Sequence, residues 1–556
     1  MCGAADRCRR LHAARRRVRV AAVSREVVRD AAGIGEARSA LGVRIVMGRN
    51  RRVRVGLVLA ALALGSLGAC ARNSRHEAAD TRAAPLAGAV TLRVMSFNIE
   101  WGGANVRFQS VIDAIRASGA DIVGVQEAEG NLQRIAADLG WHYNLRNYVV
   151  SRYPILDPPG ADGRYVYVEI RPGRVVAMAN VHLPSDPYGP DWIRDGREIA
   201  DVLNLERRLR LPKIEPYLRV LPGLAANGVP VFLSGDFNAP SHTDWTEAVV
   251  RTRRFPAYAV DWPVSRVVVT AGLRDSYRDM HPDPLTQPGF TWWAKRQRIR
   301  DYNPGENDAQ DRIDLLWYAG PARVTRSEVV GEAEGPGVSI VVMPWPSDHR
   351  GVVSSFEVVP APLPLFVAAE RRVTRADEPL RIVYHAPGLA RGAIAVERLS
   401  EAAPGPAVER IPIDTARGGV ELPAHALAAG SYQAALIDAS GRARSRNEFW
   451  ILDPDAAPSL SISGSRFAAG APVPIRWQNA PGNRNDWLAV FEASAPRDAQ
   501  EPGTWAYLGA RSAGALDLAP PSADGAWPLP PGRYVVRLLK DDSYEILAES
   551  PPFTVE

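Results

Sequence analysis

The stretch Val229-Pro230-Val231-Phe232-Leu233-Ser234-Gly235-Asp236-Phe237-Asn238 sets an apolar run directly against a polar ending. A short apolar run next to glycine and asparagine predicts a buried β-strand, and Asp236 and Asn238 fall where that strand stops. Such a strand spans roughly 17–20 Å, so polar residues that end several aligned strands can meet at one edge of a sheet. The pattern therefore predicts a polar cluster at a sheet edge.

The same arrangement recurs along the chain in a fixed order. Polar residues follow apolar runs at Asn98, Gln126-Glu127, His182 and Ser347-Asp348-His349. Asp314 lies within the apolar run 312–317, where an unpaired carboxylate is costly, so it needs a histidine, a metal or another donor nearby. Carboxylates, carboxamides and two imidazoles at one edge would bind a hard cation and supply acid–base partners. This combination indicates a hydrolase of phosphate esters.

The chemistry of each side chain suggests its role. Glu127, with Asn98 beside it, is the expected ligand of Mg²⁺, with Mn²⁺ or Ca²⁺ as substitutes. Asp236 could accept a proton from the attacking water, and Asn238 could orient the phosphate. The neighbouring Asp348 should bias His349 toward its charged form, which suits it to stabilise phosphoryl charge. His182 would be a second donor or a proton shuttle. Taken singly, each could instead be structural: a core histidine, an Asp-Asn turn or a surface dipeptide.

Seven short polar motifs occur along the chain in one order. Together they resemble the endonuclease/exonuclease/phosphatase superfamily, whose members are similar to deoxyribonuclease I and the apurinic endonucleases. The resemblance covers residues 91–358. The motifs are Asn98, Gln126-Glu127, Ser151-Arg152-Tyr153-Pro154, Asn180-Val181-His182-Leu183, Gly235-Asp236-Phe237-Asn238, Arg312-Ile313-Asp314 and Ser347-Asp348-His349.

The resemblance implies an α/β (α+β) four-layer sandwich with two central mixed sheets and a site at one edge. It also implies that Glu127 binds Mg²⁺, that Asp236 activates water or binds metal, and that Asn238 orients phosphate. His349 would contact the scissile phosphate and be oriented by Asp314. Arg152 is expected to contact the substrate phosphate, with a plain surface position as the alternative.

The substrate is less well defined by the sequence. A phosphoester is expected, with DNA as the leading candidate, because the two tryptophans and four cations of residues 291–300 could stack a base and hold a backbone. A core tryptophan pair before a solvated loop is the alternative for this segment, and it is slightly favoured. Residues 91–358 carry a net charge of −3, which argues against tight binding of a long polyanion. Phosphomonoester or sphingomyelinase-like phospholipid hydrolysis is the alternative activity, although no long apolar hairpin for lipid extraction is evident.

The amino terminus predicts export. Residues 1–69 carry a net charge of +11 and residues 70–556 a net charge of −6, so the excess of basic residues belongs to the leader. Residues 47–69 have a basic flank and a short apolar run, as in a signal peptide, and Leu67-Gly68-Ala69-Cys70 resembles the bacterial lipobox. We expect a monomer anchored in a membrane through lipidated Cys70 and facing the periplasm or cell exterior, with simple secretion as the alternative. Residues 1–46 are read as lying before the true start at Met47.

Composition and strand pattern divide the remaining chain into segments. Residues 70–90 read as a tether and residues 91–359 as the catalytic domain. Short strands punctuated by Pro and Gly predict two immunoglobulin-like β-sandwiches at residues 365–453 and 458–556, related by a repeat of about one sandwich length. These modules raise a different class of function, a surface binding protein that holds a glycan or protein partner. Trp487, Trp505 and Trp527 could form a glycan platform, but a core role is favoured.

Overall fold

The computed structural model describes residues 86–556 except 159–160, 162, 253–255, 257, 295–309, 334, 336, 390, 400–403, 500–501 and 521. The predicted signal peptide and Cys70 lie outside these residues. Two sheets form the centre of the first domain. The first runs β12-β11-β13-β1-β2-β4-β3, and the second runs β5-β6-β7-β8-β10-β9 with β14 paired to β7. Both sheets are mixed, because β1–β2 and β7–β8 are parallel pairs among antiparallel neighbours.

The strands of the first sheet are β1 (Val90–Asn98), β2 (Ile122–Gln126), β3 (His142–Asn144), β4 (Val149–Ser151), β11 (Ala322–Gly331), β12 (Val338–Val341) and β13 (Gly351–Val358). Those of the second sheet are β5 (Ile155–Leu156), β6 (Val166–Arg171), β7 (Arg174–His182), β8 (Val231–Asp236), β9 (Arg274–Asp275), β10 (Asp314–Ala319) and β14 (Ala361–Pro362). The helical segments are η1 (Trp101–Gly103), α2 (Phe108–Ser118), α3 (Leu132–Leu139), α4 (Gly189–Arg194), α5 (Ile199–Leu209), α6 (Leu211–Leu218), α7 (Leu221–Ala226), α8 (Glu247–Thr252), α9 (Pro263–Thr270) and α10 (Ser276–Met280).

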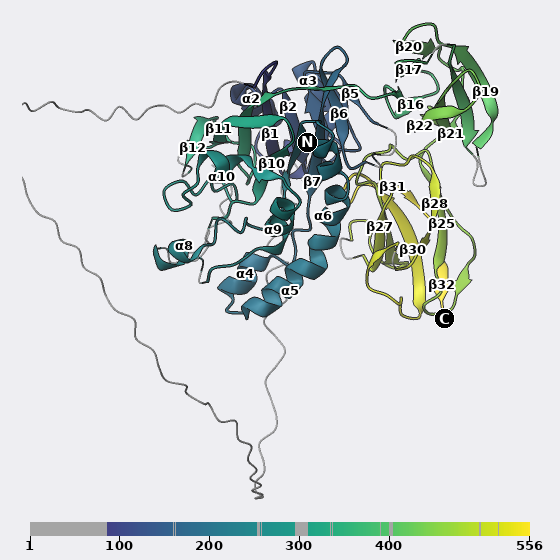
Figure 1. The fold of residues 1–556 in the computed structure, drawn as a ribbon. Helices are drawn as coiled ribbons and strands as arrows, with labels where there is room; N and C mark the ends of the chain where they lie inside the picture. Colours follow the sequence, from purple (N-terminus) through teal and green to yellow (C-terminus); the bar gives the residue numbers. More distant parts are fainter. Residues whose placement is uncertain are drawn as a thin grey trace, which may run out of the picture. The chain divides into compact units, whose positions relative to one another are not determined.

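Alternation along the central strands builds three apolar layers. In β7, Val176 and Met178 pack between the two sheets, whereas Val175, Ala177 and the residues in phase with them pack toward α6, α7 and α9. Alternate residues of a strand face opposite sides of its sheet, so one strand serves two layers. The third layer packs α2 and α3 on the outer face of the first sheet. The result is a four-layer α/β sandwich, in which α2 and α3 pack against residues of β1 and β2 (Figure 1).

Helix α2 shows how the local sequence fixes an element. Phe108, Val111, Ile112 and Ile115 recur at helical spacing and are all buried. Gly119 caps the helix with φ 64°, a left-handed conformation that glycine adopts without steric cost. The predicted helix and its stop are thus confirmed. No helix in the described ranges has the length and apolar character needed to cross a membrane.

The C-terminal half consists of strands in four further sheets. In the first sandwich these are β15-β17-β20 and β16-β22-β21-β18-β19, and in the second β23-β25-β28 and β24-β32-β30-β26-β27-β29, with β31 beside β30. The two sandwiches share one strand order, except that the second adds β29 and β31. The strands β16 and β24 occupy matching places, each parallel to the last strand of its sandwich. This correspondence agrees with the sequence repeat. An immunoglobulin-like type stays a prediction.

The strands of the first sandwich are β15 (Phe366–Ala369), β16 (Val373–Arg375), β17 (Leu380–His385), β18 (Ala393–Leu399), β19 (Pro404–Pro412), β20 (Arg417–Leu422), β21 (Gly430–Ile437) and β22 (Ala443–Leu452). Those of the second are β23 (Ser459–Ile462), β24 (Arg466–Phe467), β25 (Val473–Gln478), β26 (Trp487–Glu492), β27 (Thr504–Tyr507), β28 (Gly514–Leu518), β29 (Asp524–Gly525), β30 (Gly532–Leu539), β31 (Ile546–Glu549) and β32 (Phe553–Val555).

The tryptophans of the second sandwich pack inside it. Trp487 is buried and meets Trp505 edge-on, with ring centroids 6.2 Å apart. Trp527 is partly buried against the main core of the same sandwich. These positions favour the core role over a glycan platform.

Candidate active site

Three of the expected site residues share one line across the second sheet. In the parallel pair β7–β8, His182 lies opposite Asp236, and in the antiparallel pair β8–β10, Asp236 lies opposite Asp314. All three therefore stand at the same edge, because β7 and β8 end there and β10 begins there. His182 Nε2 lies 3.5 Å from Asp236 Oδ2. The sheet register, rather than any loop, sets this spacing.

The first sheet contributes Asn98 and Glu127 at its own edge. Asn98 ends β1 opposite Gln126, the last residue of β2. The Asn98 amide nitrogen donates to Glu127 Oε1 at 2.9 Å and to Asp236 Oδ2 at 3.1 Å. This buried amide therefore joins carboxylates from the two sheets. Its Oδ1 accepts from the backbone N–H of Glu100, so direct metal ligation by Asn98 stays a prediction.

Glu127 sits in a tight turn just past β2. Its φ of 53° is in the left-handed region, which is uncommon for a residue with a Cβ. Its carboxylate accepts from Asn98 and from the backbone N–H of Trp101, which lies 3.1 Å from Oε2. The turn and these two donors aim a half-exposed carboxylate at the edge where the other site residues gather.

His349 is held between carboxylates. Its Nδ1 lies 2.9 Å from Asp314 Oδ2, and its Nε2 lies 3.7 Å from Asp236 Oδ2. Burial alone would lower the pKa of His349, but the charges of Asp314, Asp236 and Asp348 raise the pKa well above its ordinary value. The imidazole is therefore held in its charged form, facing the site through Nε2.

Asp236 is the centre of the cluster and is 1% exposed. Burial raises its pKa, and the Asp314 charge adds to this, while His349 and His182 oppose it. A raised pKa makes a carboxylate a better proton acceptor near neutral pH. Asn238 donates to Asp236 from its backbone N–H at 2.9 Å and from its amide at 3.2 Å, which fixes the carboxylate plane.

The residues present suit a divalent cation. Ligand atoms of Asp236, Asp314 and His349 all lie within 4.8 Å of one another, and the two carboxylates, rather than the charged imidazole, are the groups that could bind a cation. Asp314 Oδ1 is buried without a hydrogen-bond partner among the described residues. A buried carboxylate oxygen with no donor is costly, and a cation would satisfy it. Glu127 adds a half-exposed carboxylate on the other side of Asn98.

One expected site residue lies elsewhere. Arg152 follows β4, and Ser151 pairs with Ile122 at the start of β2, whereas the site is at the end of β2. The Arg152 guanidinium is half exposed, 3.7 Å from Asp121 and over the ring of Trp141. The expectation that Arg152 contacts the substrate phosphate is therefore wrong, since the antiparallel pairing carries it to the opposite end of the sheet.

Two other expectations receive a structural account. Gln126 donates to Asn180 Oδ1 at 2.6 Å, so it joins β2 to β7 beneath the site. Asp348 Oδ1 is 3.9 Å from His349 Nε2, close enough to add to the field on the imidazole.

In the segment 291–300, Trp292 is half-buried with its ring 6.4 Å from that of His349, and Trp293 is buried. The cationic residues 295–300 lie outside the described residues.

Two supporting residues were missed. Ser347 Oγ donates to the backbone carbonyl of Asn98 at 2.7 Å and accepts from the His349 N–H, so it ties the His349 loop to β1. Glu100 accepts from the Asp348 N–H at 3.1 Å. Ser347 stood within a recognised motif, but nothing in the local pattern marked Glu100, which lies two residues beyond a strand end.

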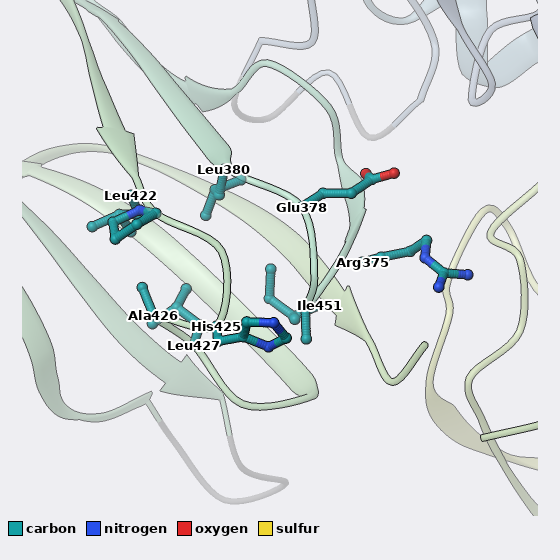
Figure 2. A pocket seen from close by; sticks show the side chains of 10 residues that line it. Arg375, Glu378, Leu380, Leu422, His425, Ala426, Leu427 and Ile451 are labelled. Carbon is teal, nitrogen blue, oxygen red and sulfur yellow. The ribbon is translucent and has the colours of Figure 1, made fainter. Parts of the chain in front are cut away.

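A small pocket lies in the first β-sandwich, away from these residues. Figure 2 shows Leu380, Leu422 and Ile451 lining it beside the ring of His425. Its other lining residues are Arg375, Ala376, Glu378, Pro423, Ala426 and Leu427. It contains none of the residues gathered at the sheet edge.

Comparison with known proteins agrees with this geometry. Residues 95–349, which make up less than half of the chain, match the model of the Endonuclease/Exonuclease/phosphatase family. Members of the family are hydrolases that act on phosphoesters and typically use divalent metals. The matched range begins within β1 and ends at His349, and it contains every residue of the cluster.

Among individual proteins, the chain is similar to the uncharacterized protein F14F9.5 of Caenorhabditis elegans, at 29% identity over 258 residues, covering 41% of this chain and 79% of that protein. The crystal structure of an endonuclease/exonuclease/phosphatase from Beutenbergia cavernae is similar at 17% identity and a TM-score of 0.30, covering 65% of this chain and 99% of that one. The inositol polyphosphate 5-phosphatase domain of SPsynaptojanin is similar at 12% identity and a TM-score of 0.28, covering 49% and 85%.

Proposed function

We propose that this chain is an exported, Mg²⁺-dependent phosphodiesterase whose site is the cluster around Asp236. The observation that carries the proposal is the position of Asp236 Oδ2. Donor atoms from Asn98, Asn238, His182 and His349 lie 3.1, 3.2, 3.5 and 3.7 Å from it. These donors fix the carboxylate in place, and burial raises its pKa in spite of them, as a general base requires.

Each residue then has a role in hydrolysis of a P–O bond. Asp236 accepts a proton from a water molecule as the water oxygen attacks phosphorus. The charged His349, oriented by Asp314, donates a hydrogen bond to a phosphoryl oxygen, where negative charge builds up. His182 donates a proton to the departing alkoxide. Mg²⁺, when held by Glu127 beside Asn98, would neutralise charge on the phosphoryl oxygens.

The proposal is tested by product release from the purified protein with Mg²⁺. The substrates are bis-p-nitrophenyl phosphate, p-nitrophenyl phosphate, plasmid DNA and sphingomyelin in parallel. We expect diester hydrolysis, reduced at least about 100-fold in Asp236→Asn because the general base is lost. Asp498→Asn, an exposed carboxylate in the second sandwich, is the matched control and should behave as wild type.

The outcomes separate the candidate activities. Nicking of DNA that depends on Asp236 would identify DNA as a substrate. Activity on the monoester or the lipid alone would replace the diesterase proposal with a phosphatase or phospholipase. Hydrolysis that survives both Asp236→Asn and His349→Ala would refute the site itself.

Export and anchoring through Cys70 form a separate part of the proposal, supported by the leader pattern of residues 47–70. Growth with an alkyne-bearing fatty acid should label the protein, and Cys70→Ser should abolish the label. An unlabelled wild-type protein found in the medium would favour simple secretion.

A further inference from the structure

The second β-sandwich contacts the catalytic domain beside the site. Arg484, in the loop between β25 and β26, donates to the backbone carbonyl of Asn180 at 2.9 Å and to the Tyr217 hydroxyl at 2.6 Å. Asn180 belongs to β7, two residues before His182. The β6 pairing of β7 ends at Met178, which leaves the Asn180 carbonyl free to accept from Arg484. The sandwich therefore binds to the strand that carries a site residue.

A second contact comes from the turn between β30 and β31, residues 540–543. The Asp541 carboxylate accepts from the backbone N–H of Gly130, three residues beyond Glu127. Asp541 is 2% exposed, and its other oxygen has no hydrogen-bond partner among the described residues. A Cβ at Gly130 would lie 3.1 Å from the Lys540 side chain, so the turn packs closely on this loop. All of these residues belong to one compact unit, Arg82–Glu556.

The turn brings negative charge to the site edge. Asp542 follows Asp541 and keeps solvent-exposed surface, with Oδ1 accepting from the Tyr507 hydroxyl at 2.5 Å. The surrounding protein desolvates its carboxyl and raises its pKa, and the charges of both His182 and Glu127 act on it.

We propose that Asp542, supplied by the second β-sandwich, is a specificity-determining residue that selects against substrates with further phosphates next to the one cleaved. The favoured class is a compact phosphoester whose flanking group on this side is uncharged or cationic. This inference rests on the proposed function of the Asp236 cluster. It also gives the second sandwich a role in the chemistry of that cluster rather than as a spacer.

Electrostatics supports the direction of the effect. A second phosphate near the Asp542 carboxylate is repelled when that carboxylate is ionised, and a unit charge about 10 Å away at a protein surface changes binding by roughly three- to tenfold. The repulsion is screened at high salt, since the Debye length falls from about 30 Å at 10 mM to about 3 Å at 1 M. A flanking group without charge escapes this repulsion.

The test compares wild type, Asp542→Asn and the control Asp498→Asn. Asparagine suits position 542, because its φ of 63° is left-handed and asparagine tolerates that region. Asp498 is an exposed residue of the same sandwich, in the chain segment after β26. The substrates are bis-p-nitrophenyl phosphate, with one charge, and an octathymidylate, with several. Binding of fluorescein-labelled octathymidylate is followed in parallel by anisotropy at 10 mM and 1 M NaCl.

We expect Asp542→Asn to raise the ratio of kcat/KM on octathymidylate to that on bis-p-nitrophenyl phosphate about three- to tenfold at 10 mM NaCl. It should tighten octathymidylate binding by a similar factor, and both gains should vanish at 1 M NaCl. Asp498→Asn should match wild type. If Asp542→Asn and Asp498→Asn give the same ratio and the same affinity, the inference is overturned while the proposed function stands. If neither substrate is hydrolysed but Asp542→Asn still tightens binding, the proposed function fails and the charge selection stands.

Discussion

The Nδ1 atom of His349 and the Oδ2 atom of Asp314 lie 2.9 Å apart, and both side chains are buried. Asp314 starts β10, so the sheet fixes the carboxylate, and the carboxylate in turn fixes the imidazole. The other ring nitrogen then faces Asp236. This order of support, from sheet to carboxylate to imidazole, explains why an acidic residue occupies an otherwise apolar strand.

We expect Asp314→Asn to lower kcat about 10²- to 10⁴-fold, because His349 loses both its orientation and its charge. The pKa of His349 should also fall, since the Asp314 charge is the largest influence that raises it. The alkaline limb of the pH–kcat profile should therefore move to lower pH. Asp348→Asn, which removes a weaker influence on the same ring, is the matched control and should move the limb less. Equal shifts in the two variants would argue against the Asp314 assignment.

Glu127 is the residue expected to hold the cation, so its replacement should change the metal requirement. We expect Glu127→Gln to raise the Mg²⁺ concentration for half-maximal activity at least about tenfold, since even indirect supports of metal ligands cost about 10- to 100-fold. A Mg²⁺ titration of the initial rate measures this. Glu129→Gln is the control, because the pKa of Glu129 is about 9 and its carboxyl is neutral near pH 7. If Glu129→Gln shifts the titration and Glu127→Gln does not, the two roles are reversed.

Much of the site was predictable because strand ends meet at sheet edges. The apolar runs predicted the strands β7, β8 and β10. The register of these strands is enough to align His182, Asp236 and Asp314. Arg152 was mispredicted because the motif around it reveals no strand direction. Only the antiparallel pairing of β4 with β2 shows that it lies at the far end.

Long-range packing accounts for what the sequence did not indicate. Glu100 contacts the His349 loop from 248 residues away, through the Asp348 N–H. Asp541 contacts Gly130 across a separation of 411 residues. Neither contact leaves a local pattern, since each depends on how distant segments pack. The pattern of short strands punctuated by Pro and Gly predicted the second sandwich, but it did not indicate that one of its turns reaches Gly130.

Glu206 and Arg210 form an ion pair that supports the segment after His182. Both are 0% exposed, with Arg210 Nη1 2.6 Å from Glu206 Oε1, and Arg210 Nη2 donates to the carbonyls of Ser185 and Pro187. Arg210→Met would leave a buried carboxylate and two carbonyls without their donor. We expect a loss of about 3–5 kcal/mol in the free energy of unfolding, measured in urea.

The double variant Glu206→Gln, Arg210→Met tests whether the unpaired carboxylate of Glu206 causes the loss of stability in Arg210→Met. It removes the buried charge as well as its partner, so it should recover part of the stability lost in Arg210→Met. A double variant less stable than the single one would show that Glu206 has another role.

Asp541 should make stability depend on pH. Burial raises its pKa to about 7, the hydrogen bond from Gly130 opposes this, and the charge of Asp542 adds to it. The unfolded carboxyl titrates near 3.8. Between about pH 4 and pH 7 the folded state therefore holds a proton that the unfolded state has released, so stability falls as pH rises through this window. Below pH 4 both states are protonated, and the penalty is absent.

Asp541→Asn removes this titration and keeps an oxygen to accept from Gly130. The melting temperature of Asp541→Asn minus that of wild type should grow by a few degrees as the pH increases from 4.5 to 7.5. The reason is that ionising a carboxyl whose pKa is raised by this much costs at most about 4 kcal/mol. Thermal unfolding at closely spaced pH values measures the difference, and Asp498→Asn should follow wild type throughout. A melting temperature that falls in Asp541→Asn equally at every pH would mean that the carboxylate is ionised across the whole range. In that case the turn at residues 540–543 would carry its full charge beside Glu127 even at pH 4.5.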